Sequence, residues 1–181
     1  RLIRRQRQMC IRDRAKVGIA SKLFSRIGAS DNISKGQSTF MVEMLETSNI
    51  IKNADDRSFI ILDEIGRGTS TYDGLAIAWA IIEKVLRSNK SRTLFATHYH
   101  ELTEIEKTNS KVKNVSCEIK EWNDEIIYSY KVVEGKSKGS LGIKVAELAG
   151  FPGDVIVEAK ALLGKLQSKG VNQEDIQLKE E

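Results

Sequence analysis

The feature that most constrains the fold is a short apolar run that ends in two acidic residues and a glycine-rich loop. The run is Phe59–Leu62, the acids are Asp63 and Glu64, and residues 65–71 form the loop. Apolar, largely β-branched residues without polar alternation indicate a strand buried on both faces of a parallel sheet. Such a strand delivers its last side chains to the carboxyl edge of the sheet, where open α/β sheets bind ligands.

Two adjacent carboxylates at this edge are unfavourable unless a cation compensates them, and Mg²⁺ with nucleotide phosphates is a common solution. One acid can then hold the metal, often through water, while its neighbour orients or deprotonates an attacking water. The alternative is that Asp63 and Glu64 cap the next helix, because acidic residues favour helix starts. We favour the nucleotide interpretation and keep the capping alternative open.

Helical and extended segments alternate around this strand. Ser38 or Thr39 would cap a first helix, with Glu43 in its first turn. A second helix is predicted from Leu75 to Leu86, and a further strand from Thr93 to Ala96. Strand, helix and strand in this order predict a βαβ unit in a parallel sheet. The apolar face expected for the first helix comprises Met41, Met44, Leu45, Ser48 and Ile51.

The second half of the chain predicts a β-hairpin and two helices. The hairpin comprises Val112–Trp122 and Glu125–Val133, with its turn at Asn123–Asp124. A helix over Ile143–Leu148 follows, and another begins near Pro152 with an apolar stripe. We therefore expect four parts: a basic segment at 1–14, an α/β domain at 15–140, a helical pair at 141–167 and a polar tail at 168–181.

The positive charge of the chain is concentrated at its start. The net charge is +4, yet residues 1–14 hold six arginines and one aspartate, so the rest carries −1. The body of the chain is therefore not basic, and its charge gives no argument for direct nucleic-acid binding. The segment 1–14 could be a nucleic-acid arm, a targeting peptide or foreign sequence. Because the composition changes abruptly at residue 15, we expect foreign sequence.

Cysteine content and hydropathy indicate the cellular compartment in which the chain works. Two cysteines are too few for a disulfide framework, which favours a reducing, cytosolic setting. No apolar run approaches the length of a membrane span, so we expect no membrane partner.

His98 is a further candidate for the same ligand. It follows the predicted strand 93–96, 35 residues after Asp63, and neighbouring parallel strands end at the same edge. An imidazole there can donate to a phosphate oxygen, whereas the alternative is a surface histidine at the start of a loop. A metal pair with His100 is weakly supported, because no further histidine or cysteine ligands accompany it.

The 181 residues contain no complete phosphate-binding loop of the form G-x-x-x-x-G-K-[ST]. Gly135, Lys136 and Ser137 match its end, but Tyr130 stands where the first glycine is required. We interpret this stretch as a flexible loop.

Several ordered strings of residues resemble the ATPase domain of the MutS family of DNA mismatch-repair proteins. The strings are Phe24–Asp31, Ser38–Met44, Leu62–Gly74 and Phe95–Tyr99, and Val145–Pro152 resembles the start of the family's C-terminal helix-turn-helix. The resemblance covers about Ala15 to Leu166. It implies an α/β fold with the C-terminal half of an ABC-type P-loop NTPase sheet, because the family's P-loop lies upstream of Phe24.

The resemblance also implies an Mg²⁺-dependent ATPase that works as a homodimer with composite ATP sites. Asp63 would hold Mg²⁺ through water, Glu64 would activate the hydrolytic water, and His98 would sense the γ-phosphate. Ser38 and Thr39 would reach the nucleotide bound by the other subunit. A loop across the dimer interface would comprise Gly66, Arg67, Gly68, Thr69, Ser70 and Thr71, and Tyr130 is a weaker match to an adenine contact.

The same resemblance implies partners and a location. The helix pair 143–166 would be a dimerisation element, mismatched double-stranded DNA would bind through domains outside these residues, and a MutL-like repair factor would be recruited. The setting would be the bacterial cytosol. Because the P-loop is missing, we expect the isolated chain to bind ATP poorly and to be inactive alone.

Two other functions remain open from the sequence. The first is a transporter or chromosome-maintenance ATPase of the same superfamily, which would carry Leu-Ser-Gly-Gly-Gln where residues 33–37 read Ile-Ser-Lys-Gly-Gln. The second is an ATPase-incompetent fragment that acts only as a dimerisation module through its C-terminal helices.

Overall fold

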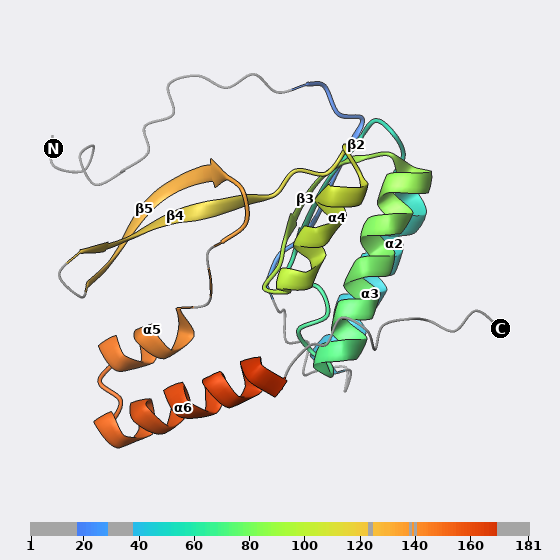
Figure 1. Ribbon diagram of the computed structural model, residues 1–181. Coiled ribbons are helices and arrows are strands. Elements are labelled where there is room, and N and C mark those ends of the chain that lie inside the picture. Colours follow the sequence, from blue (N-terminus) through green and yellow to red (C-terminus); the bar gives the residue numbers. More distant parts are fainter. Residues whose placement is uncertain (1–17, 29–37, 123–124, 138, 140, 170–181) are drawn as a thin grey trace, which may run out of the picture. The chain divides into compact units, whose positions relative to one another are not determined.

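The computed structural model describes residues 18–28, 38–122, 125–137, 139 and 141–169. The basic segment 1–14, the hairpin turn 123–124 and the end of the tail from residue 170 lie outside these ranges. The contacts divide the chain into two compact units, with the boundary after Lys136. Figure 1 shows the elements of both units, which we describe separately.

A parallel sheet forms the centre of the first unit. Its strands are β1 (Lys22–Arg26), β2 (Ser58–Asp63) and β3 (Arg92–Ala96), hydrogen-bonded in that order with β2 in the middle. The predicted βαβ unit and the parallel pairing of its two strands are confirmed. The sheet thereby brings the ends of β2 and β3 to one edge, with Asp63 in register with Ala96.

The central strand is enclosed unequally on its two faces. Ile60 and Leu62 are completely buried, whereas Phe59 and Ile61 are only partly covered. The expectation that both faces of this strand are fully buried is therefore wrong within the described chain, because only one face meets the core. That core joins Ile60 and Leu62 to Ile50 and Val85 from the helical segments on either side of β2 in sequence.

Helix α2 (Thr39–Asn53) begins where the sequence predicted. The Ser38 hydroxyl caps it by accepting a hydrogen bond from the Met41 N–H at 3.2 Å. The sequence predicted Glu43 in the first turn of this helix. The structure places it one residue beyond the first four, so that prediction is wrong. It is also buried, which no capping role would require.

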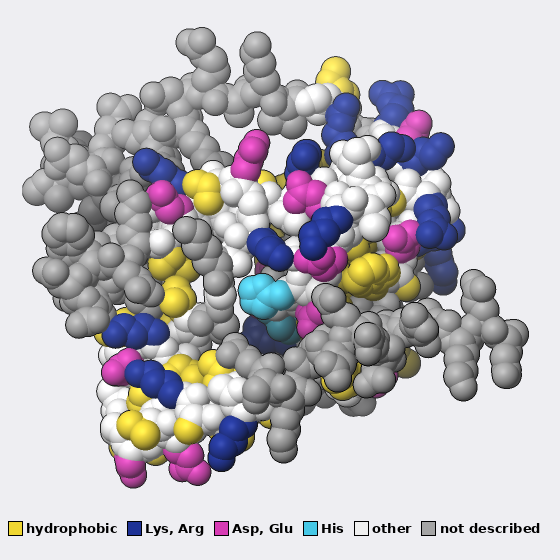
Figure 2. Space-filling model, viewed as in Figure 1, with side chains coloured by type: hydrophobic (Ala, Val, Ile, Leu, Met, Phe, Trp, Pro, Cys, Tyr) yellow, Lys and Arg dark blue, Asp and Glu magenta, His cyan; other side chains and the backbone are white. Residues whose placement is uncertain are grey.

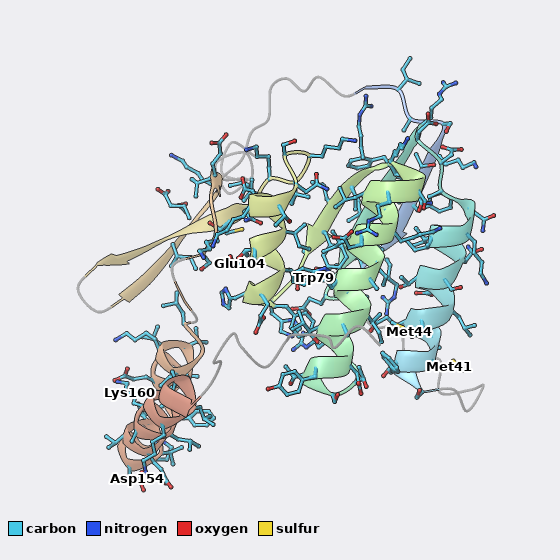
Figure 3. All side chains as sticks on the ribbon, turned by 45° about the vertical axis from the view of Figure 1, so that its right-hand side comes forward. Met41, Met44, Trp79, Glu104, Asp154 and Lys160 are labelled. Atoms are coloured by element: carbon cyan, nitrogen blue, oxygen red, sulfur yellow. The ribbon has the colours of Figure 1, made fainter. Side chains whose placement is uncertain are left out.

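The buried face of α2 differs from the predicted apolar face. Its buried residues are Glu43, Thr47 and Ile50, whereas Met41 and Leu45 are 52% and 53% exposed. Figure 3 shows Met41 and Met44 near one end of this helix, beside α3. This difference between the predicted and the observed buried face has a physical cause. The hydrogen bond of Glu43 described below fixes this side of the helix against the neighbouring loop.

Helix α3 (Thr71–Lys84) starts at the end of the loop that follows the acid pair. Its N-cap is Ser70, whose hydroxyl accepts from the Asp73 N–H at 3.3 Å. The alternative that Asp63 and Glu64 cap this helix is therefore wrong, since Asp63 lies seven residues and Glu64 six residues before the cap. Helix α3 continues into a π-helical turn, η2 (Val85–Asn89), which ends at Lys90 with a left-handed φ of 55°.

The remaining elements of the first unit follow β3. A 3₁₀ turn, η3 (His100–Glu104), and a short helix, α4 (Ile105–Thr108), were not predicted. The predicted hairpin is confirmed as β4 (Val115–Trp122) and β5 (Glu125–Glu134), paired antiparallel with an irregularity between Cys117 and Ile119.

The second unit contains two helices, α5 (Gly142–Leu148) and α6 (Gly153–Lys169), as the sequence predicted. Gly150 between them has a φ of 85°, a conformation that glycine adopts readily. Among the residues of this unit that the structure describes, these large apolar side chains are exposed: Val145, Leu148, Phe151, Val155, Val157, Leu162, Leu163 and Leu166. None of the described helices in either unit is long and apolar enough to cross a membrane.

Candidate functional site

A pocket of about 330 Å³ lies at the carboxyl ends of β1 and β2. It brings together residues from β1, the start of α2, the end of β2 and the β2–α3 loop, which we define as residues 64–70. Five of the eight lining residues were predicted from the sequence, and three were not. The lining residues are Arg26, Gly28, Thr39, Glu43, Asp63, Glu64, Arg67 and Gly68.

The two predicted acids occupy different environments at this pocket. The Asp63 carboxylate has no hydrogen bond or ion pair among the described residues, so one half-buried anion faces the pocket unneutralised. Glu64 has a left-handed φ of 51°, its N–H donates to the Ala96 carbonyl at 3.0 Å, and its carboxylate pairs with Arg67. A non-glycine residue in this backbone region is uncommon and clusters at functional sites.

The acids could contribute to a metal site, but they do not form one alone. Within the described ranges, no group of three or more His, Cys, Asp and Glu side chains could hold a metal ion. Mg²⁺ keeps several waters and uses one or two carboxylates together with phosphate oxygens. The unpaired Asp63 carboxylate fits that role, with the remaining ligands coming from water and phosphate.

Ser38 and Thr39 are placed at the N-terminus of α2. Thr39 lines the pocket, whereas the exposed Ser38 serves as the helix cap and is not among the lining residues. The helix N-terminus contributes unpaired N–H groups and a partial positive charge, which favour an anion.

The β2–α3 loop is held through Gly66, whose φ is 91°. The Gly66 N–H donates to Glu43 Oε1 at 2.7 Å, and the Gly66 carbonyl accepts from the Tyr99 hydroxyl at 3.0 Å. Gly68 in the same loop packs against Phe40, since a Cβ at Gly68 would lie 3.1 Å from the Phe40 Cβ. The predicted loop residues Gly66–Thr71 therefore occupy two different places. Gly66, Arg67 and Gly68 lie near the pocket or α2, whereas Ser70 caps α3 and Thr71 is its first residue.

Sequence reasoning missed Glu43 and Tyr99 as site residues. Glu43 is 8% exposed and Tyr99 is 5% exposed. Burial raises the pKa of the Tyr99 phenol, and the charges of Glu43 and Glu101 raise it further, so the hydroxyl remains a donor at neutral pH. No signal in the sequence identified Glu43, because the predicted apolar face of the helix excluded it. The burial of its carboxylate, which is rare without a partner, became evident only in the structure.

His98 lies at the same sheet edge but is not part of this pocket. It is exposed, and its ring packs on Tyr99 with the ring centroids 4.2 Å apart. The structure thus connects His98 to the β2–α3 loop through Tyr99 and does not bring its imidazole together with Asp63 and Glu64. Tyr130 belongs to β5, and its side chain lies outside the described part of the chain.

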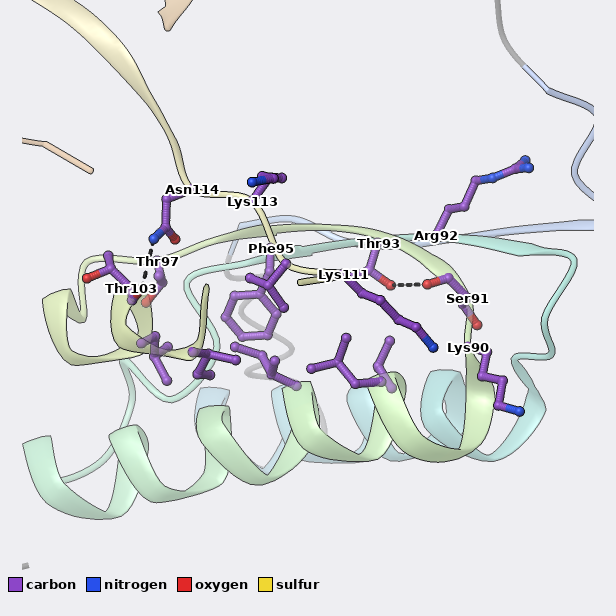
Figure 4. Close-up of a pocket in the computed structure, with 16 residues that line it drawn as sticks. Lys90, Ser91, Arg92, Thr93, Phe95, Thr97, Thr103, Lys111, Lys113 and Asn114 are labelled. Atoms are coloured by element: carbon purple, nitrogen blue, oxygen red, sulfur yellow. Dashed lines mark hydrogen bonds between the residues drawn. The ribbon is translucent and has the colours of Figure 1, made fainter. Parts of the chain in front are cut away.

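A second pocket, of about 530 Å³, lies along β3 and α3. Its floor is apolar, with Phe95 at its centre, and its rim carries Lys90, Arg92, Lys111 and Lys113 (Figure 4). It shares no lining residue with the acid pocket. Among the described strands β3 has β2 on one side only, so this hollow borders an open edge of the sheet.

The surface charge does not form a nucleic-acid-binding stripe on the face shown in Figure 2, where acidic and basic side chains of the described residues are interspersed. This distribution agrees with the net charge of −1 for the chain beyond residue 14.

Comparison with known proteins extends this description. The family model for MutS domain V matches residues 10–167. DNA mismatch repair protein MutS of Desulfosudis oleivorans is 59% identical over 152 residues, which cover 83% of this chain and 17% of that protein. The MutS proteins of Thermodesulfovibrio yellowstonii and Caldicellulosiruptor saccharolyticus are 54% and 56% identical, over 86% and 88% of this chain.

The chain spans only 17–19% of the length of these three relatives, all named for DNA mismatch repair. The matches cover the acid pair, the β2–α3 loop, His98 and both C-terminal helices. On this evidence, the chain belongs to the MutS family of DNA mismatch-repair proteins and corresponds to its domain V.

Proposed function

We propose that this chain is the C-terminal half of the ABC-type ATPase of a MutS protein, which couples nucleotide state to the binding of mismatched DNA. The observation that carries the proposal is the acid pocket, where the adjacent Asp63 and Glu64 converge with Thr39 from a separate segment. The printed names of the relatives, DNA mismatch repair protein MutS, support the cellular process.

Each acid has a distinct part in the proposed hydrolysis of ATP. Mg²⁺ would screen the phosphate charge during the reaction, with Asp63 as its carboxylate partner. Glu64 would accept a proton from the attacking water, and this role requires its carboxylate to exchange Arg67 for water. Because the Glu64–Arg67 pair is solvent-exposed, the exchange carries little penalty.

Other site residues act across a dimer in this proposal. Ser38 and Thr39 at the start of α2 would contact the phosphates bound by the partner subunit, and residues 66–71 would cross the interface. His98 would approach the γ-phosphate only when a nucleotide reaches the sheet edge, since it lies outside the acid pocket. The weaker proposal for Tyr130 is an adenine contact.

The phosphate-binding loop would come from outside these 181 residues, in agreement with the greater length of the relatives. The open edge of β3, with its apolar hollow, is suited to accept a further strand from that region. This proposal explains why the isolated chain should bind ATP weakly. Mismatched DNA and a MutL-like factor would bind the complete protein, in the bacterial cytosol.

The test is Glu64→Gln in a full-length MutS protein that carries this chain as its domain V. We expect ATP binding to persist and steady-state hydrolysis to fall by about 10²- to 10⁴-fold, because the general base is removed. Asp56→Asn, an exposed acid at the other end of β2, is the matched control and should leave hydrolysis unchanged. Unchanged hydrolysis in Glu64→Gln would refute the proposed function, and loss of ATP binding would assign Glu64 a structural role.

A second function, as a dimerisation module, is favoured by the exposed apolar side chains of α5 and α6. Contiguous exposed apolar surface marks interaction sites. Sedimentation of the 181-residue chain separates the possibilities: a dimer without ATPase activity supports the module, and a monomer at all concentrations excludes it.

A further inference from the structure

We propose that Glu43 and Tyr99 are positioning residues that hold the backbone of Gly66, one at its N–H and one at its carbonyl, and couple the β2–α3 loop to helix α2 and to the His98 segment. The inference rests on the proposed ATPase function for its kinetic consequences. Its structural content is a joint formed at the backbone N–H and carbonyl of Gly66, and this joint can be tested separately.

The first half of the joint is a buried carboxylate. Glu43 is 8% exposed, and its Oε1 accepts the Gly66 N–H at 2.7 Å across 23 residues of sequence. Burying a carboxylate is unfavourable unless hydrogen bonds compensate it, so this bond strongly specifies where the loop sits. Glu43 also lines the acid pocket, so one side chain contacts both the ligand space and the loop.

The second half is a buried phenol. The Tyr99 hydroxyl donates to the Gly66 carbonyl at 3.0 Å, and Tyr99 is 5% exposed. The N–H and the carbonyl of Gly66 are thus both hydrogen-bonded to side chains from elements far away in sequence. Tyr99 directly follows His98 and packs on its ring, so a displacement of the imidazole would also shift the phenol.

The surrounding backbone restricts the movement of Gly66 at this joint. A Cβ at Gly74 in α3 would lie 2.2 Å from both the Gly66 carbonyl oxygen and the Tyr99 hydroxyl. A Cβ at Gly66 would lie 2.6 Å from the Gly74 carbonyl oxygen, and Gly66 has a φ of 91°. The loop therefore packs directly on α3 while Glu43 and Tyr99 hold it from the other sides.

The consequence follows from what these elements carry. Helix α2 starts at Ser38 and Thr39, which we propose contact the partner's nucleotide, and His98 is proposed to sense the γ-phosphate in its own subunit. Through Glu43 and Tyr99, these two elements would both act on the backbone of Gly66, in a loop that is proposed to cross the dimer interface. The joint would thus transmit the state of one ATP site to the other, which a contact used only for stability would not do.

The first measurement is hydrogen–deuterium exchange of the full-length protein with Tyr99→Phe, which removes the hydroxyl and keeps the ring. We expect the peptide containing Gly66 to exchange about tenfold faster, because a weakened local structure opens more often. Peptides from the β2 core should be unaffected. Tyr72→Phe is the control, since Tyr72 is 83% exposed at the start of α3. Unchanged exchange around Gly66 would overturn the joint.

The second measurement compares Glu43→Ala, Glu43→Gln and Tyr99→Phe in steady-state ATP hydrolysis. We expect Glu43→Ala and Tyr99→Phe to lower kcat about tenfold with KM changed less than twofold, and Glu43→Gln to recover most of the loss. Because the two residues hold the backbone of the same residue, Gly66, the double variant Glu43→Ala/Tyr99→Phe should lose no more than the more impaired single variant. Thr47→Val, on the same buried face of α2, should keep wild-type kcat.

The possible outcomes separate the two proposals. If Glu64→Gln abolishes hydrolysis while Glu43→Ala and Tyr99→Phe keep both wild-type kcat and wild-type loop exchange, only the joint is refuted. If Glu64→Gln leaves hydrolysis intact, the proposed function fails and the exchange measurement still decides the joint. If Glu43→Ala does not fold, Tyr99→Phe and Glu43→Gln decide it. Lower thermal stability with unchanged kcat per folded molecule would make the contact purely structural and refute the coupling.

Discussion

The two ends of strand β2 use acidic residues in opposite ways. At the amino end, Asp55 accepts hydrogen bonds from the Ser58 hydroxyl at 2.7 Å and the Arg57 N–H at 3.1 Å, and pairs with Lys22 at 3.0 Å. At the carboxyl end, Asp63 has no such partner among the described residues, and Glu64 has one exposed arginine.

This difference separates an acid that organises structure from acids available for chemistry. The hydrogen bond from Ser58 and the charge of Lys22 hold the pKa of Asp55 at about 2, so its negative charge is stabilised by the folded protein itself. Asp63 and Glu64 face a pocket instead, where a cation from outside could supply the compensation. Saturated partners therefore mark a structural acid here, and missing partners mark Asp63, which we propose to be functional.

The largest expected effect is at the loop that follows the two acids for which we propose a function. Gly74→Ala would place a methyl group against the Gly66 carbonyl and the Tyr99 hydroxyl, and the Gly66 backbone cannot move away easily. We expect the free energy of unfolding to fall by about 3 kcal/mol or more, as for severe overpacking. Urea unfolding of the 181-residue chain measures it, with Gly164→Ala, where a Cβ meets nothing within 4 Å, as control. Equal stability of both variants would show that the loop is not fixed against α3.

The next effect tests the structural acid. Asp55→Asn should destabilise the chain at neutral pH, because the folded state favours the charged carboxylate. A carboxylate whose pKa is lowered on folding contributes stability above its unfolded pKa of 3.8 and loses it as pH falls toward about 2. The stability difference between wild type and Asp55→Asn should therefore shrink between pH 5 and pH 2. A difference independent of pH would assign the effect to packing.

A smaller effect, of opposite sign, is expected on α2. The Thr47 hydroxyl is buried without a hydrogen-bond partner among the described atoms. Thr47→Val replaces it by a methyl group of similar size, and we expect the free energy of unfolding to rise by about 0.5–1 kcal/mol. Thermal unfolding detects this as a higher Tm. A lower Tm would mean that the hydroxyl has a partner, such as water.

The smallest effect on stability is expected for Asp63, the acid that we propose holds Mg²⁺. Asp63→Asn removes a charge that has no partner in the described structure, so stability should change by no more than about 0.5 kcal/mol. In the full-length protein the same change should raise the Mg²⁺ concentration needed for hydrolysis. If Asp63→Asn destabilises the chain as much as Asp55→Asn, the contrast between the two ends of β2 is wrong.

Much of the fold was predictable because its signals are local. The apolar run before Asp63 identified β2, helical spacing identified α2 and α3, and Gly150 with Pro152 marked the break between the C-terminal helices. The prediction failed where long-range contacts override local pattern. The face of α2 is turned toward Glu43 by a bond to a loop 23 residues away, and η3 with α4 has too few residues for a period to emerge.

The sequence by itself determined the family, the acid pair and the edge of the sheet at which that pair lies. These follow from ordered strings of residues and from the rule that parallel strands end together. Only the tertiary structure decided that Glu43 and Tyr99 hold Gly66 and that His98 lies outside the acid pocket. The physical reason is that the contacts of Glu43 and Tyr99 end on the backbone of Gly66, whose position depends on the folded chain and leaves no periodic pattern in the sequence.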